Sequence, residues 1–199
     1  MELEFKPVVA GDIDRLRPFY GMRPNKTCDS VFLDSFLWKD YYHVQCAVSE
    51  GRAALWLMEK DGRVSTAMPL CREEDLPYFF QQMVDYFSEV LHKPFYISLA
   101  DEEAVQYLNL DPALFEVEEQ VDLKDYLYSG EELRKLEGKK FVKKRNHLNG
   151  FKRMYEGRYE YRRLCCSDRH EVWQFMERWR QHREEVGAME LSLDYEVAG

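Results

Sequence analysis

No two of the ten glycines in this sequence are separated by a single residue. The missing G-x-G pattern excludes the dinucleotide-binding fingerprint and the loop with which ordinary acetyltransferases hold coenzyme A, and there is no Walker A loop. No serine lies in a G-x-S-x-G elbow. Because these backbone cradles for nucleotide cofactors are missing, we expect no cofactor.

Histidine and cysteine are too scattered for a metal centre. None of the five histidines lies four residues from another, and the five cysteines include no C-x-x-C pair. Such spacings matter because metal ligands must converge on one point. We therefore predict no metal site, and we interpret the cysteines as reduced structural thiols.

Long apolar runs are also missing. No stretch of about 18 apolar residues occurs, and the N-terminus MELEFKPVVAGD carries an acid at its second position and lacks the apolar region of a signal peptide. A composition of 45% hydrophobic and 15% aromatic residues is nevertheless sufficient for a packed core. We predict a folded cytoplasmic protein without a transmembrane segment.

Positive charge is scarce overall but concentrated in one segment. The net charge is −9, yet residues 139–158, KKFVKKRNHLNGFKRMYEGR, contain eight basic residues and a single acid, Glu156. An acidic chain that gathers cations in one place favours a local site for an anion over a general coating of nucleic acid, so we expect no DNA binding.

This basic segment also has a helical apolar period. At 100° per residue Phe141, Leu148, Phe151 and Tyr155 form one stripe, which predicts a helix over 139–155 with that stripe facing a core. Lys139, Lys143, Asn146 and Arg153 fall on the opposite side, whereas Lys144, Arg145 and Lys152 lie inside the stripe or at its edge. Cations in that position snorkel, pair with an acid or line an anion site.

The first part of the chain predicts an α+β domain with helices on a mixed sheet over residues 1–120. Apolar periods of 3.6 and 2 indicate two short helices, three antiparallel strands and a long helix, with Lys60-Asp61-Gly62 as a hairpin turn. Residues 95–100 (FYISLA) and part of 114–123 are expected to be strands, and Asp101 is expected to cap a helix between them.

A second unit is predicted to begin near residue 121. Ser129 and Glu132 form a capping box ahead of a short helix, the basic helix follows, and residues 159–164 read as a strand. A last long helix begins at Ser167 or Asp168 and ends at Gly187. One clear strand cannot form a sheet by itself, which favours residues 121–199 as the opening of a domain that this chain leaves incomplete.

The densest polar cluster is Lys144-Arg145-Asn146-His147. An arginine can clamp a phosphate through two hydrogen bonds, and Asn146 and His147 could contact a ribose or transfer a proton. Equally, both are residues found on any solvated helix face.

The segment from Asp125 to Tyr155 resembles the signature of the bacterial phosphatidylglycerol lysyltransferase C-terminal-like family, in which D-Y-L/I-Y, L-x-G-K-K and K-R-N-H-x-N-x-F follow one another. The resemblance implies two tandem GNAT-like folds, the second truncated here, related to the FemABX transferases that take an aminoacyl group from tRNA. The matched motif positions are Lys139, Lys140, Lys144, Arg145, Asn146, His147 and Asn149.

Together these observations predict an acyl or aminoacyl transferase that binds a phosphorylated donor such as aminoacyl-tRNA. The expected substrate-binding residues are Lys139, Lys140, Lys143, Lys144, Arg145, Asn146, His147, Asn149 and Arg153. The alternative is a non-catalytic interaction module whose basic helix docks an acidic surface or polyanion. Attachment to anionic lipid is a third, weaker hypothesis, because a lone cationic helix offers little apolar surface to insert. The sequence assigns no catalytic residue and no oligomeric state.

Overall fold

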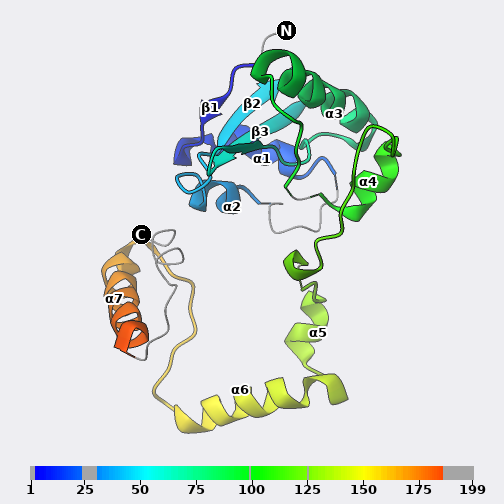
Figure 1. Ribbon diagram of the computed structural model, residues 1–199. Coiled ribbons are helices and arrows are strands. Elements are labelled where there is room, and N and C mark those ends of the chain that lie inside the picture. Colours follow the sequence, from blue (N-terminus) through cyan, green and yellow to red (C-terminus); the bar gives the residue numbers. More distant parts are fainter. Residues whose placement is uncertain (1–2, 24–30, 99, 125, 186–199) are drawn as a thin grey trace. The chain divides into compact units, whose positions relative to one another are not determined.

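The computed structural model describes residues 3–23, 31–98, 100–124 and 126–185. The chain divides into two compact units, Met1–Asp125 and Tyr126–Gly199, which we call the N-terminal and C-terminal units (Figure 1). Each is described by itself.

The N-terminal unit is built on a four-stranded antiparallel sheet in the order β1-β2-β3-β4. The strands are β1 (Lys6–Pro7), β2 (Gln45–Ser49), β3 (Ala53–Lys60) and β4 (Arg63–Ser65). Cys46 lies opposite Trp56 in the β2–β3 pair. The predicted hairpin at Asp61-Gly62 joins β3 to β4, and both residues have positive φ, 51° and 79°. Two such residues give the turn whose twist matches that of the flanking strands.

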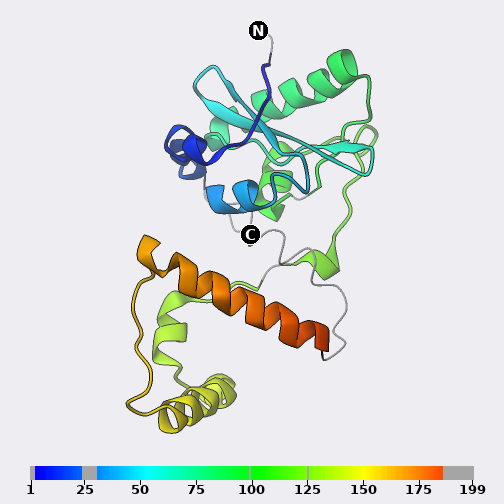
Figure 2. The ribbon, with the colours of Figure 1, turned by 90° about the vertical axis from the view of Figure 1, so that its left-hand side faces the viewer.

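Helices cover both faces of this sheet. They are α1 (Ile13–Tyr20), α2 (Phe32–Leu37), α3 (Leu76–Asp85) and α4 (Glu102–Leu108). A π-helical segment, Tyr86–Leu91, continues α3 and ends at His92, whose φ is 52°. Figure 2 shows α3 on one side of the sheet and α1 and α2 on the other. The predicted α+β class is therefore confirmed.

Strand β3 is the centre of the core because it is buried on both faces. Ala53 and Leu55 pack with Phe79 of α3 and with Phe87 of the π-helical segment. Ala54 and Trp56 belong to a second cluster, with Leu16 and Phe19 of α1. Burial of a large apolar side chain contributes about 1.5 to 3 kcal/mol, so these two layers supply most of the stabilisation of this unit.

A buried ion pair joins distant parts of the N-terminal unit. Both oxygens of the Asp101 carboxylate accept from Nη1 of Arg23, at 3.0 and 3.1 Å, and both side chains are only 5% exposed. Oδ1 of Asp101 also accepts from the backbone N–H of Ala104 at 2.9 Å, which caps α4 as predicted. One carboxylate thus neutralises a buried cation and starts a helix.

The C-terminal unit contains α5 (Gly130–Lys135), α6 (Val142–Met154) and α7 (Arg169–Glu185), with short 3-10 turns before α6 and α7. The predicted cap of α5 is present, since Ser129 Oγ accepts from the N–H of Glu132 at 3.4 Å. Phe141 and Asp168 are the two buried side chains among the residues described in this unit. Leu148, Phe151 and Tyr155, predicted to face a core, are each at least 40% exposed. That expectation holds for Phe141 alone, because no sheet lies in the described part of this unit to receive the stripe.

The side chain of Arg145 in α6 is hydrogen-bonded to the turn that connects α5 to α6. Its Nη1 donates to the carbonyls of Leu136 and Gly138, the latter at 2.8 Å. Leu136 is left-handed (φ 50°), and Gly138 has φ 81° and ψ 175°, a conformation open essentially to glycine only. The L-x-G segment of the motif therefore forms a tight turn, and the side chain of Arg145 donates hydrogen bonds to two of its carbonyls.

Three predicted strands are wrong. Residues 95–98 make a single parallel bridge, in which Thr66 N donates to Tyr96 O at 2.9 Å and Ser98 N donates to Thr66 O at 3.2 Å. Residues 115–120 are irregular, and Phe115 packs on Phe80 and Phe95 instead of on a neighbouring strand.

Residues 159–164, the third of these strands, are irregular and exposed. Arg162 ties this segment to the start of α7 by donating to both oxygens of Asp168, at 2.7 and 2.8 Å. A strand needs a neighbour for its backbone hydrogen bonds, and the described residues offer none here. The predicted end of α7 at Gly187 lies outside the described residues.

Replacing Asp101 with alanine should destabilise the N-terminal unit by about 3 to 5 kcal/mol, because it leaves Arg23 charged, buried and unpaired. Urea unfolding followed by circular dichroism measures this loss. Glu89→Ala, at an exposed position on the π-helical segment, is the matched control and should stay within about 0.5 kcal/mol of wild type. A loss below about 1 kcal/mol for Asp101→Ala would contradict the prediction.

Replacing Arg145 with alanine should loosen the α5–α6 connection by about 0.5 to 1.5 kcal/mol, the net contribution of a typical intramolecular hydrogen bond. Amide hydrogen exchange measures this locally, as faster exchange over residues 130–145. Lys143→Ala is the control, since it removes a cation from the same helix without removing an ion pair. Equal rates of amide exchange over residues 130–145 in the two variants would show that the hydrogen bonds of Arg145 do not stabilise this connection.

Candidate functional site

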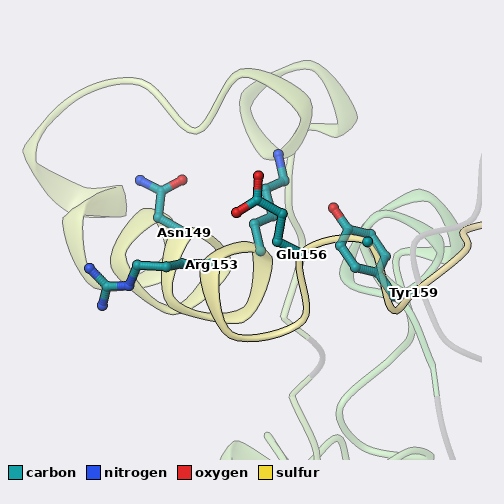
Figure 3. Close-up of a pocket in the computed structure, with 6 residues that line it drawn as sticks. Asn149, Arg153, Glu156 and Tyr159 are labelled. Atoms are coloured by element: carbon teal, nitrogen blue, oxygen red, sulfur yellow. The ribbon is translucent and has the colours of Figure 1, made fainter.

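An open pocket of about 640 Å³ lies at the end of α6. Its lining residues are Asn149, Lys152, Arg153, Glu156, Gly157 and Tyr159. In Figure 3 the side chains of Asn149, Glu156 and Tyr159 project from the same side of the chain. The pocket is thus formed by one helix face and the turn that follows it.

Helical spacing explains how three of these residues come together. Lys152 and Arg153 follow Asn149 by three and four positions, so the three lie along one face of α6, and Glu156 lies in the turn just after the helix. Gly157 then reverses the chain with φ 68°. This turn returns the ring of Tyr159 to Phe151, with ring centroids 5.1 Å apart, and places Tyr159 at the pocket.

The charged groups of the pocket form no ion pairs within the part of the chain that the structure describes. Among the residues that the structure describes, neither Lys152 nor Arg153 lies within 4.0 Å of a carboxylate, and Glu156 lies within that distance of no cation. All three are exposed. The pocket therefore presents two cations, one anion, a carboxamide and a phenol to solvent.

The other predicted binding residues have different environments. Lys140 pairs with Glu132 at 2.7 Å. Lys144 lies over the ring of Tyr128, 5.6 Å from its centroid, and Arg145 caps the preceding turn. These three cations of the motif are therefore engaged within the C-terminal unit.

Four further predicted residues are exposed, and their side chains make no ion pair or hydrogen bond with any residue that the structure describes. They are Lys139, Lys143, Asn146 and His147. On a helical projection Lys139, Lys143 and Asn146 share a face with Arg153, within an arc of about 80°. His147 lies farther round, toward Phe151. The structure thus groups the candidates into a cationic face and a pocket that meet at Arg153.

Of the predicted residues, only Asn149 and Arg153 line the pocket. The sequence pattern placed Lys152 at the edge of the apolar stripe but did not mark it as a binding residue, and it gave no sign of Glu156, Gly157 or Tyr159. The i, i+3, i+4, i+7 spacing from Asn149 to Glu156 could have revealed Lys152 and Glu156. Nothing in the local pattern showed that Gly157 would return Tyr159 to the helix.

The described cysteines fall into two classes. Burial raises the pKa of the Cys46 thiol to about 12 and that of Cys71 to about 11, so both remain protonated at neutral pH. Cys165 and Cys166 are exposed beside the start of α7. Within the described ranges, no three His, Cys, Asp or Glu side chains gather as ligands for a metal ion.

Comparison with solved structures finds the same fold in a crystal structure of a conserved protein of unknown function from Bacteroides thetaiotaomicron VPI-5482. The TM-score is 0.85 at 21% sequence identity, and the match covers 98% of this chain and 65% of that one. The chain thus spans about two thirds of the length of this relative. No curated protein matches the sequence. None of the described helices has the length and apolar character to span a bilayer.

Comparison with family models matches residues 23–196 to the C-terminal domain of phosphatidylglycerol lysyltransferase. The matched range contains the whole α5–α6 connection, including Gly138 and Arg145, together with the cationic face and the pocket. The resemblance seen in the sequence motif is confirmed over most of the chain. This protein belongs to the phosphatidylglycerol lysyltransferase C-terminal family.

Proposed function

We propose that the protein is an aminoacyl transferase that holds a phosphorylated donor, aminoacyl-tRNA, on the cationic face of α6. The observation that carries the proposal is a set of cations along α6 and the turn before it, Lys139, Lys143 and Arg153, which form no ion pair with any residue that the structure describes. The family description names a lysyltransferase, so we take lysyl-tRNA as the donor to test first. We further propose that both units are GNAT-like.

The cationic face suits a run of phosphates. From Lys143 to Arg153 the helix rises about 15 Å, which spans several phosphates of one RNA strand. Each cation that neutralises a phosphate releases counterions, so binding becomes strongly dependent on salt. Because Lys140, Lys144 and Arg145 are engaged elsewhere, we assign the phosphate contacts to the unpaired cations.

The transfer itself requires no covalent enzyme intermediate in this proposal. A hydroxyl or amine of the acceptor attacks the carbonyl carbon of the aminoacyl ester. The new ester or amide bond forms as the bond to the ribose oxygen breaks, and the acceptor proton ends on that oxygen. The protein contributes by holding donor and acceptor in a reactive orientation.

A second candidate function is an interaction module that docks an acidic protein surface. It is favoured by the charge distribution, since residues 1–125 contain twice as many acidic as basic residues while residues 126–199 carry a net positive charge. In this case an acidic polypeptide such as polyglutamate should displace RNA at an equal concentration of charge, and no lysyl transfer should occur.

The double variant Lys139→Gln/Lys143→Gln should weaken binding of lysyl-tRNA and flatten its salt dependence. The slope of log K against log salt should fall by about 0.7 to 0.9 for each phosphate that the variant no longer neutralises. Fluorescence anisotropy across a salt titration provides the measurement. Neither residue lines the pocket, so the pocket is left intact.

The control for this experiment is Lys6→Gln/Lys93→Gln, which removes the same charge from exposed positions in the N-terminal unit. It should keep the slope of the wild-type protein. Equal slopes for all three proteins would exclude the cationic face as the donor site.

A further inference from the structure

Glu156 is the one acid in the basic segment 139–158, and it lies in the pocket. Lys152 is four residues away, yet no cation among the described residues comes within 4.0 Å of the Glu156 carboxylate. The side chain is exposed and projects from the chain on the same side as Asn149 and Tyr159 (Figure 3). Within the described ranges, the pocket thus presents a carboxylate without an ion-pair partner next to cations that also have none.

The position of Glu156 contributes nothing favourable to the helix. It follows the last residue of α6, Met154, by two positions, where the negative end of the helix dipole repels a carboxylate. The order of lysine first and glutamate four residues later is also the weaker orientation for a helical ion pair. A structural role in the helix therefore does not explain an acid at this position.

The geometry points to a zwitterionic ligand, and we infer that Glu156 binds the ammonium group of the aminoacyl moiety while Lys152 and Arg153 hold a phosphate of the same donor. This inference rests on the proposed function and specifies the part of the donor that enters the pocket. Glu156 lies in the turn directly after α6, and it lines the same pocket as Lys152 and Arg153. One ligand that carries both charges can therefore reach both partners.

The remaining lining residues fit the end of an aminoacylated RNA. Asn149 offers both a donor and an acceptor to a ribose or an ester carbonyl. The ring of Tyr159 is held against Phe151 and half exposed, so its free surface can cover a base or an aminoacyl side chain. A bare phosphate would leave Glu156 close to a like charge, which disfavours it as the ligand.

The probe for this site is 3′-lysylamino-3′-deoxyadenosine 5′-phosphate, in which an amide replaces the labile ester. Its partner probe is acetylated on both amines and so lacks the cations. Wild-type protein should bind the free-amine probe about fivefold more tightly than the acetylated one, the upper end of what an exposed ion pair supplies. Isothermal titration calorimetry measures both affinities.

Glu156→Gln should bind both probes equally. Glu160→Gln, which removes the same charge from an exposed position outside the pocket, should keep the preference. The inference is overturned if Glu156→Gln keeps the preference, if Glu160→Gln loses it as well, or if wild-type protein binds the two probes equally or not at all.

Two further results separate this inference from the proposed function. If the probe preference depends on Glu156 but lysyl-tRNA binding is unaffected by the Lys139/Lys143 variant, the cationic face is wrong and the pocket assignment stands. The second result comes from flotation of the protein with phosphatidylethanolamine vesicles. If the protein binds these vesicles in a way that requires Glu156 but does not bind the soluble probe, the pocket belongs to a lipid headgroup and the inference is overturned.

Discussion

One nitrogen of Arg145 donates to the carbonyls of Leu136 and Gly138, and the start of α6 depends on this interaction. The turn before α6 contains two residues with positive φ, and within it the Gly138 carbonyl accepts one long backbone hydrogen bond, from the N–H of Phe141 at 3.4 Å. A guanidinium carries several donors in a rigid plane, which allows one side chain to serve both carbonyls. These two hydrogen bonds hold the turn against the helix that carries the cationic face and the pocket.

The lysines of the basic segment 139–158 have distinct roles because their partners differ. Lys140 has an acid within reach in α5, and Lys144 lies over an aromatic ring, so both stabilise the C-terminal unit. Lys143 and Lys152 have neither among the described residues, and their charge remains available to a ligand. A residue's place in a motif therefore does not reveal whether it holds the fold or binds a substrate; its neighbours in space do.

Local signals predicted the turns and caps of this protein well. Asp61-Gly62 forms its hairpin turn, and Asp101 and Ser129 cap the helices expected of them, because each depends on residues only two or three positions away. The strand at 95–100 failed because strands depend on a partner elsewhere in the chain, and the partner supplied one bridge at Thr66. The same limit explains why Tyr159 was missed, since it reaches the pocket through the turn at Gly157 and its contact with Phe151. Glu156 could have been found from its spacing to Asn149.

The apolar stripe of α6 shows what such a site needs besides charge. A helix of this length is marginal alone in water, and Phe141 is the one fully buried member of the stripe. Phe151 nevertheless contacts both Tyr155 and Tyr159, at centroid distances of 4.8 and 5.1 Å. This aromatic cluster joins the last turn of the helix to the chain beyond Gly157. The cluster acts as a small core on one side of α6, and it keeps Tyr159 at the pocket while the charged groups on the other side stay solvated. The pocket can therefore retain its arrangement without ion pairs that would neutralise it.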